Sequence, residues 1–380
     1  MKYLPYGRQE IDDADIAAVT AALRSEWLTT GPIVDQFETD FARYTGARYA
    51  ISVSSGTAAL HAIMHAIGIG AGDEVITTAL TFAATANAVL YCGGIPVFAD
   101  VKPGSLLIDP QSVSEKVGKR TRAIIAMDYA GQPCDYEELR SIARAHNLTL
   151  VADACHSLGA RYHGRSVGTL GDLNAFSFHP VKNMTTGEGG MVTTNAATTA
   201  NSIRAFRNHG ITTDHRQRAA AQTHSYEMVD LGFNYRLSDL QCALGVSQLK
   251  KLPGWLTRRA RIAEQYTQLL QGVPGVRPLE VLTDRDNAYH LFVVYFEDQE
   301  NPDLRDHVFA RLRQDGIGCN VHYRPVYLHP YYRDRLSYSP NLCPSAECVY
   351  RRILSLPIFP QMDSADVIRV VDGLRAALNV

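Results

Sequence analysis

Three features of this sequence lie where they could do chemistry: a small-residue turn, an acidic residue and a lysine. The turn Ser54-Ser55-Gly56-Thr57 follows the apolar run 50–53 and precedes a helical pattern. At the start of a helix, such a turn lets backbone N–H groups and the positive helix end approach an anion such as a phosphate. A plain turn with a serine or threonine cap would use the same residues, so both interpretations stay open.

The acidic residue is Asp153, which ends the apolar run 148–152. A carboxylate at the end of a buried strand is costly unless a cationic partner accompanies it. A protonated pyridine nitrogen would be one such partner, and the carboxylate would then keep the ring protonated and able to accept electrons. An arginine, or a turn that the side chain caps, would satisfy Asp153 equally well.

The lysine is Lys182, which lies between the predicted strand 175–178 and the glycines Gly187, Gly189 and Gly190. No charged residue stands close to it before Glu188. Partial removal from water lowers the pKa of a lysine and makes its amine a better nucleophile. A solvated loop lysine is the alternative for any single lysine, and the whole string 174–192 argues against it.

The elements that must position these residues alternate along the first two-thirds of the chain. Apolar runs predict strands at 50–53, 74–77, 95–99, 122–127, 148–152, 175–178 and 191–194, and helical patterns predict helices at 58–67, 83–91 and 136–146. This alternation predicts an α/β fold with a mostly parallel sheet covered on both faces. Ligands of such sheets lie outside the carboxyl ends of the strands, so the three features are expected to converge there.

The remainder of the chain predicts a second, smaller unit. A break at Leu252-Pro253-Gly254 divides a large domain, 1–253, from an α+β domain, 254–380, as expected for a chain of 380 residues. Helices are predicted at 255–270, 304–314 and 364–378, the last with Asp363 or Ser364 as its N-cap, and strands at 290–296 and 317–321. The first residues of the chain are expected to pack near the active site.

Composition excludes several classes of partner. The net charge is −2, from 37 basic and 39 acidic residues, so neither nucleic acid nor an anionic membrane surface is expected to bind. We find no signal peptide and no apolar stretch that could span a bilayer. The seven cysteines form no C-x-x-C pair, which indicates thiols in a reducing compartment. We therefore predict a cytoplasmic protein without a metal site.

Four strings give the sequence a family resemblance. They are Ser-Ser-Gly-Thr-Ala-Ala-Leu, Asp-Ala-Cys-His-Ser-Leu-Gly-Ala, Phe-Ser-Phe-His-Pro-Val-Lys-Asn with Gly-Glu-Gly-Gly, and Gly-Phe-Asn-Tyr-Arg-Leu-Ser-Asp-Leu-Gln-Cys-Ala-Leu-Gly. With them the chain resembles, over essentially its full length, the DegT/DnrJ/EryC1/StrS family of sugar aminotransferases. That family has the fold-type I architecture of aspartate aminotransferase and uses pyridoxal 5′-phosphate (PLP).

The resemblance implies a role for each matching residue of the ring site. Lys182 matches the lysine that carries the cofactor as a Schiff base, and Asp153 matches the partner of the pyridine nitrogen. His156 matches a position, often glutamine in relatives, that contacts the phenolic oxygen. Phe82 matches the aromatic residue that stacks on the ring. Because Lys182 is present, the dehydratase branch, which carries histidine there, is disfavoured.

The resemblance also implies how the phosphate is held. Gly56, Thr57 and Ser177 match the phosphate cradle. Asn234, in Gly-Phe-Asn-Tyr-Arg, matches a residue that reaches the phosphate from the other subunit. The protein is therefore expected to be a homodimer with shared active sites.

The string 318–332 is similar to the pseudaminic acid branch of the family. That branch aminates C4 of UDP-4-keto-6-deoxy-N-acetyl-β-L-altrosamine, and the family implies L-glutamate as the amino donor. Tyr6, Thr30, His322 and Tyr323 are the substrate-binding candidates on this resemblance. A packing role for His322 and Tyr323, or another nucleotide sugar such as UDP-4-keto-arabinose, stays open.

Two other functional classes can be set against this interpretation. A non-catalytic regulator with the PLP fold would have no need of both Lys182 and Asp153. A nucleotide-sugar dehydrogenase needs a Gly-rich fingerprint directly after the first strand. The glycines of 68–72 follow a predicted helix, so that context is missing.

Overall fold

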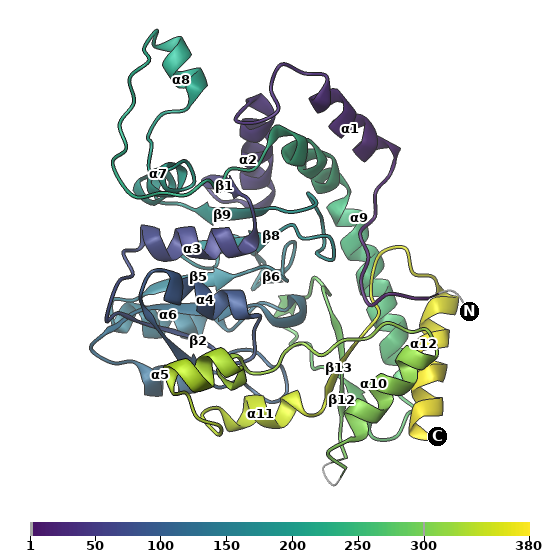
Figure 1. Ribbon diagram of the computed structural model, residues 1–380. Coiled ribbons are helices and arrows are strands. Elements are labelled where there is room, and N and C mark those ends of the chain that lie inside the picture. Colours follow the sequence, from purple (N-terminus) through teal and green to yellow (C-terminus); the bar gives the residue numbers. More distant parts are fainter. Residues whose placement is uncertain (1–2, 299–300) are drawn as a thin grey trace.

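The computed structural model describes residues 3–298 and 301–380, and its main element is a seven-stranded sheet of order β1-β9-β8-β5-β4-β2-β3 (Figure 1). The strands are β1 (Tyr49–Val53), β2 (Glu74–Thr78), β3 (Ile95–Ala99), β4 (Thr121–Met127), β5 (Thr149–Asp153), β8 (Leu173–Ser177) and β9 (Gly190–Thr194). β9 is antiparallel to both of its neighbours, whereas β8, β5, β4, β2 and β3 pair in parallel. The predicted mostly parallel sheet is confirmed.

Alternate residues of the central strands enter two different cores. In β4, Ile125 packs into a core on one face of the sheet, and Ile124 packs into a core on the other face. Successive side chains of a strand point to opposite faces, so a strand covered on both sides must be apolar at every position. This is why β4 has a continuous apolar run.

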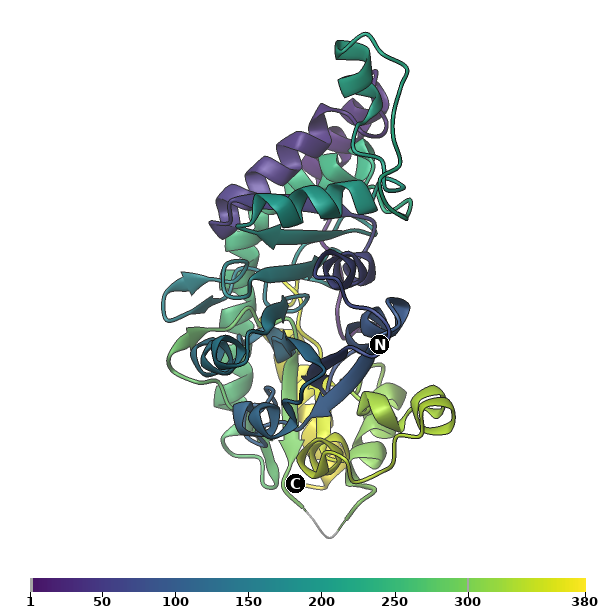
Figure 2. The same cartoon turned by 90° about the vertical axis from the view of Figure 1, so that its left-hand side faces the viewer.

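Helices lie on both sides of this sheet (Figure 2). The helices up to β9 are α1 (Asp13–Leu23), α2 (Pro32–Thr45), α3 (Gly56–Ala66), α4 (Ala83–Tyr91), α5 (Pro110–Lys116) and α6 (Tyr136–Ala145). α3 packs against α4, and α5 packs against α6. The sequence analysis placed α3, α4 and α6 within two residues of these bounds but contained no prediction for α1, α2 or α5.

A second sheet, of order β10-β12-β13, belongs to the C-terminal part of the chain. Its strands are β10 (Val276–Pro278), β12 (Phe292–Phe296) and β13 (Ile353–Leu356), and the helices of this part of the chain are α10 (Leu304–Gln314), α11 (Pro344–Tyr350) and α12 (Ser364–Leu378). Asp363 is the N-cap of α12, and its carboxylate accepts a 2.9 Å hydrogen bond from the Asp366 amide. A third, small sheet joins β11 (Arg285–Asp286), β6 (Arg161–Tyr162) and β7 (Arg165–Ser166).

The predicted interruption of the secondary structure at Leu252-Pro253-Gly254 is wrong. A single helix, α9 (Asp239–Leu270), runs through it with Pro253 inside. Proline inside a helix costs about 3 kcal/mol, but α9 packs along its length against α1, α2 and α12, so tertiary burial outweighs this local cost. A domain boundary at 253 stays a prediction, and α9 links the two parts without interruption.

The predicted strand at 317–321 is also wrong. Ile317 forms an isolated bridge with Leu4, and Asn320 forms another with Ser355. The segment passes between the N-terminal chain and β13 and pairs only briefly with each, so extended residues form no regular ladder. The bridge with Leu4 joins the chain's first described residues to the C-terminal part.

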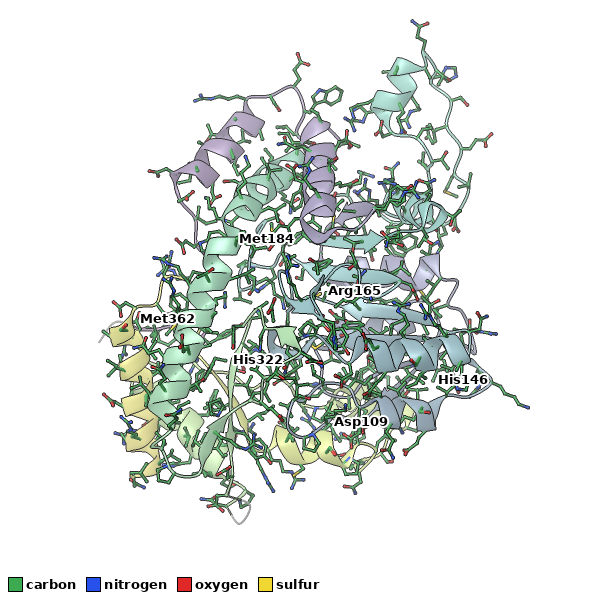
Figure 3. All side chains as sticks on the ribbon, turned by 180° about the vertical axis from the view of Figure 1, so that it is seen from behind. Asp109, His146, Arg165, Met184, His322 and Met362 are labelled. Carbon is green, nitrogen blue, oxygen red and sulfur yellow. The ribbon has the colours of Figure 1, made fainter. Side chains whose placement is uncertain are left out.

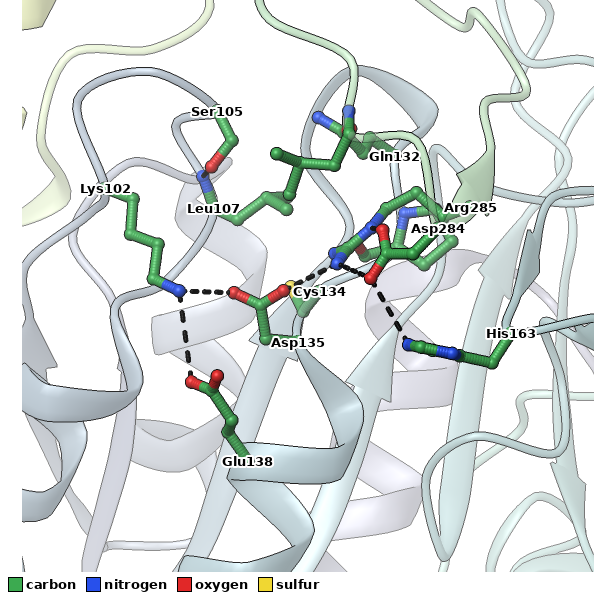
Figure 4. Close-up of polar contacts among 12 residues, drawn as sticks. Lys102, Ser105, Leu107, Gln132, Cys134, Asp135, Glu138, His163, Asp284 and Arg285 are labelled. Carbon is green, nitrogen blue, oxygen red and sulfur yellow. Dashed lines mark hydrogen bonds and ion pairs between the residues drawn. The ribbon is translucent and has the colours of Figure 1, made fainter.

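An ion-pair cluster ties the segment before β12 to the large sheet (Figure 4). The buried Arg285 guanidinium contacts Asp135 at 2.7 Å and Asp284 at 2.6 Å, and it also donates to the Pro133 carbonyl. Lys102 contacts the other oxygen of Asp135 at 2.7 Å. Beyond this anchor, the Ala288 amide donates to the Gly131 carbonyl at 2.9 Å. The segment 284–291 is therefore held against the loop that follows β4.

An arm between β9 and α9 extends away from the body, at the upper left of Figure 1. It starts after α7 (Ala197–Phe206) and contains the short helix α8 (His215–Ala220). Its apolar side chains Tyr226, Met228, Val229 and Leu231 are exposed. Within residues 3–298 and 301–380, no helix has the length and apolar character needed to cross a membrane.

Candidate active site

A cavity of about 960 Å³ opens at the carboxyl edge of the large sheet, between that sheet and the C-terminal part. It is lined by ten of the residues predicted from the sequence: Tyr6, Gly56, Thr57, Phe82, Asp153, His156, Ser177, Lys182, His322 and Tyr323. The convergence arises because β1, β5 and β8 are parallel and end at the same edge. The expectation that the chain's first residues approach the site is confirmed by Tyr6.

The turn after β1 forms one end of the cavity. The Ser55 hydroxyl caps α3 by accepting from the Ala58 amide at 3.0 Å. A Cβ atom on Gly56 would lie 2.8 Å from the Ser177 Cβ, so only glycine lets the turn approach β8 this closely. A small, polar concavity at the positive end of a helix suits a phosphate group.

Asp153 is buried, with 4% of its surface exposed, at the end of β5. Its Oδ2 accepts a 2.7 Å hydrogen bond from the Thr85 hydroxyl, and its Oδ1 accepts a 3.3 Å hydrogen bond from the Cys155 amide. In the described part of the chain, no lysine or arginine forms an ion pair with it. The alternative of an arginine partner therefore finds no support, and a buried carboxylate at a cavity wall suits a cationic ring nitrogen.

Lys182 follows β8 in an irregular loop, with its backbone amide donating to the His179 carbonyl at 2.9 Å. The side chain is half-buried, and burial lowers the pKa of its amine, against the opposing effect of Cys155 and Asp153. Its Nζ lies 3.5 Å from Nε2 of His290. The amine is thus easier to deprotonate than that of a solvated lysine, as a nucleophile requires.

Aromatic residues form the wall beside Lys182. The His156 ring lies 4.2 Å from the His290 ring between centroids, and His156 Nε2 is 3.0 Å from the Tyr323 hydroxyl. Burial lowers the pKa of both histidines well below the ordinary value, so both rings are neutral at neutral pH. Phe82 is 59% exposed at the cavity surface, with its ring 6.1 Å from that of Tyr323, and is free to cover a flat ligand.

His322 lies near the middle of the molecule (Figure 3) and lines the cavity, but both of its ring nitrogens are engaged. Nδ1 lies 2.8 Å from the Ser355 hydroxyl, and Nε2 lies 3.3 Å from Nδ2 of the Asn320 side chain. Burial lowers the pKa of His322 to about 3. The packing alternative for this residue therefore has a structural basis, and Tyr323 carries the polar atom nearer the site.

Two predicted residues are not part of this cavity. Thr30 lines a separate hollow of about 400 Å³ together with Asn208 and Arg236. Asn234 is exposed at the base of the arm, where it pairs with Asn208 in an isolated bridge. Within one chain, neither residue is brought to Lys182.

The sequence analysis missed Thr85 and His290. Thr85 lies in the string Leu-Thr-Phe-Ala-Ala-Thr, from which only Phe82 was selected. His290 was assigned to the start of a strand, because its neighbours are apolar. Neither residue has a local signal of function, since each acquires its contact from a partner far away in the chain.

These features fit PLP, residue by residue. The turn at Gly56 suits a phosphate group, and the buried Asp153 carboxylate suits a cationic ring nitrogen. The Lys182 amine, whose pKa is lowered by burial, suits a Schiff base. Phe82 offers a ring face in the same cavity.

Comparisons with known proteins agree with this site. The sequence model of the DegT/DnrJ/EryC1/StrS aminotransferase family matches residues 9–375. The spore coat polysaccharide biosynthesis protein SpsC of Bacillus subtilis (strain 168) is 39% identical over 380 residues, covering 98% of this chain and 96% of SpsC.

Two solved structures are similar over nearly the whole length. Helicobacter pylori PseC, an aminotransferase involved in the biosynthesis of pseudoaminic acid, has a TM-score of 0.94 and 30% identity and is covered completely, as is this chain. The PLP-form of the putative sugar aminotransferase Spr1654 from Streptococcus pneumoniae has a TM-score of 0.92 and 27% identity, with 99% of each chain covered.

Proposed function

We propose a specific reaction for this chain from the premise that it belongs to the DegT/DnrJ/EryC1/StrS aminotransferase family and is a PLP-dependent sugar aminotransferase. The reaction is transfer of the amino group of L-glutamate to the C4 ketone of a nucleotide-activated 4-keto-6-deoxy sugar. The sugar we infer is UDP-4-keto-6-deoxy-N-acetyl-β-L-altrosamine. The observation that carries the proposal is that Lys182 and Asp153 share one cavity in a chain that overlays PseC along its whole length.

We infer the following roles for the residues that hold the cofactor. Gly56, Thr57 and Ser177 bind the phosphate, and Asp153 binds the ring nitrogen. Phe82 covers the ring, and His156 contacts its phenolic oxygen. When bound, PLP supplies an electron sink for the charge left on carbon as a C–H bond breaks.

Lys182 holds the cofactor and then moves the proton. Its lowered pKa leaves a larger fraction of the amine uncharged, so it takes a proton from carbon and returns it as a general base and acid. Asp153 stays buried against the Thr85 hydroxyl, which orients its carboxylate toward the ring nitrogen. His156 and His290 remain neutral and add no competing positive charge beside Lys182.

The choice of substrate has two supports. One is the overlay with PseC, whose described role is in pseudoaminic acid biosynthesis. The other is the string 318–332, which is similar to the pseudaminic acid branch and contains Tyr323, a lining residue of the cavity like Tyr6. We infer that Tyr6 and Tyr323 contact the sugar and that His322 has a packing role. Thr30 is inferred to contribute to substrate binding from the separate hollow that it lines.

We infer a homodimer in which Asn234 completes the partner's phosphate site. Asn234 is exposed and outside its own cavity, and the arm next to it exposes apolar side chains such as Met228 and Leu231. A surface of this kind is typical of a protein interface. The cytoplasmic location remains an inference from the sequence.

A panel of UDP- and dTDP-linked 4-keto sugars, each incubated with L-glutamate and PLP and analysed by mass spectrometry, tests the substrate. We expect the amino sugar to form fastest from UDP-4-keto-6-deoxy-N-acetyl-β-L-altrosamine. The described role of SpsC in a spore coat polysaccharide favours a second candidate, another nucleotide 4-keto sugar, which would then give the fastest product. Product from no sugar, without an absorbance band of lysine-bound cofactor, would instead favour a regulator.

A further inference from the structure

Two threonine hydroxyls form a short chain that ends on Asp153. The Thr85 hydroxyl is 2.7 Å from Asp153 Oδ2, and the Thr81 hydroxyl is 2.7 Å from the Thr85 hydroxyl. All three residues are buried at the cavity wall. Thr85 lies in the first turn of α4, and Thr81 lies in the loop that joins β2 to α4.

The direction of these hydrogen bonds follows from the number of hydrogens. A hydroxyl has one hydrogen and can donate only once, and an ionised carboxylate can only accept. Thr85 therefore donates to Asp153, and its oxygen accepts from Thr81. Each donor strengthens the next by polarising it, so Asp153 receives a hydrogen bond stronger than an isolated hydroxyl would give.

This arrangement fixes which part of Asp153 is left for a ligand. Oδ2 is engaged by Thr85, Oδ1 accepts only a longer bond from the Cys155 amide, and in the described parts of the chain no lysine or arginine lies within ion-pair distance of the carboxylate. The Thr85 donor thus holds the orientation of the Asp153 carboxylate and leaves Oδ1 as the oxygen that is less engaged.

We propose that Thr85, itself oriented by Thr81, is a positioning residue that keeps the Asp153 carboxylate directed at the ring nitrogen of the cofactor. This inference rests on the proposed role of Asp153 and adds the Thr85 hydroxyl as the group that orients its carboxylate. Thr85 acts through Asp153 and touches no reacting atom.

Thr77 provides a matched control. It is a fully buried threonine in β2, and its hydroxyl has no hydrogen-bond partner among the described residues. Thr77→Val and Thr85→Val both replace a buried hydroxyl by a methyl group of similar size. They differ in that only Thr85→Val removes a hydroxyl that donates a hydrogen bond to Asp153.

The test measures binding of two compounds to cofactor-free enzyme by equilibrium dialysis. One is PLP, and the other is its carbocyclic analogue, in which a carbon replaces the ring nitrogen. We expect Thr85→Val to weaken PLP binding roughly tenfold, as expected for loss of a hydrogen bond to a charged group, and to change binding of the analogue less than twofold. Thr85→Ser, which keeps the hydroxyl, and Thr77→Val should bind both compounds as wild type does.

Equal weakening of both compounds by Thr85→Val, or no weakening of either, would overturn the inference. Thr85→Ala serves as a second variant if Thr85→Val does not fold, and the same two outcomes apply to it. Asp153→Asn separates this failure from failure of the proposed function. If Asp153→Asn leaves the preference for PLP over the analogue unchanged, Asp153 does not bind the ring nitrogen, and both proposals fall together.

Discussion

Nε2 of His290 lies 3.5 Å from Nζ of Lys182, although 108 positions separate the two residues in the chain. Two hydrogen bonds made by the segment around His290 support this geometry. The Leu291 amide donates to the Ala130 carbonyl at 3.2 Å, and the Asn183 side chain donates to the Ala288 carbonyl at 3.2 Å. The residue next to Lys182 and the loop that carries His290 are therefore fixed to each other.

We expect His290→Phe to lower kcat about tenfold, because a hydrogen bond that orients the Lys182 amine is worth about 1–1.5 kcal/mol. His290→Gln can still hydrogen-bond the amine and should retain most activity. Steady-state kinetics with glutamate as the varied donor measure both. His179→Gln, at the exposed rim of the same cavity, is the control. Equal activity of the phenylalanine variant and wild type would show that the contact has no catalytic role.

Lys182→Ala should abolish steady transamination while the fold survives, because the amine that holds the cofactor and moves the proton is lost. Lys182→Arg should be equally inactive, since a guanidinium stays protonated. Product formation is followed by mass spectrometry, and circular dichroism checks the fold. Sustained turnover by the alanine variant, with no amine added to the buffer, would contradict the assignment of Lys182.

Asp128 should make stability depend on pH. It is fully buried behind the turn 153–157, where it accepts from the Ser157 hydroxyl at 2.6 Å, and burial raises its pKa to about 6. A carboxyl group whose pKa is raised on folding stabilises the fold while protonated, and this contribution is lost as pH rises through about 6. Between pH 5 and pH 8 wild type should therefore lose about 1.5 kcal/mol relative to Asp128→Asn.

Urea unfolding of the cofactor-free proteins at several pH values measures this difference. The comparison uses the change with pH rather than the absolute free energies of unfolding, so a constant effect of the asparagine cancels. Parallel pH dependences of wild type and Asp128→Asn would show that the Asp128 pKa is not raised.

Mixed dimers test the shared site. Lys182→Ala and Asn234→Asp subunits should each be nearly inactive alone, the second because an aspartate repels the cofactor phosphate. If Asn234 serves the partner's site, a mixed dimer has one site with both lesions and one fully wild-type site, and activity returns on co-expression. Verified mixed dimers without activity would place Asn234 in its own subunit's site or in neither, and leave the family assignment intact.

The sequence by itself determined which residues would meet at one edge of the sheet. Ser54–Thr57, Asp153 and Ser177 each follow or end a predicted strand, and parallel strands place their carboxyl ends at one edge. Their convergence therefore needed only the order of strands and helices. The family resemblance added roles to these positions, and the cavity contains ten of the twelve predicted residues, with Thr30 and Asn234 outside it.

Only the tertiary structure decided which groups surround these residues. Thr85 meets Asp153 across 68 positions, and His290 meets Lys182 across 108, so no periodicity or motif could indicate either contact. The same holds for α9, where proline and glycine locally favour a break at 253. The helix continues because its sides are buried against α1, α2 and α12. Intrinsic helix propensity contributes little to the free energy of folding, and packing between segments that are distant in the chain outweighs it.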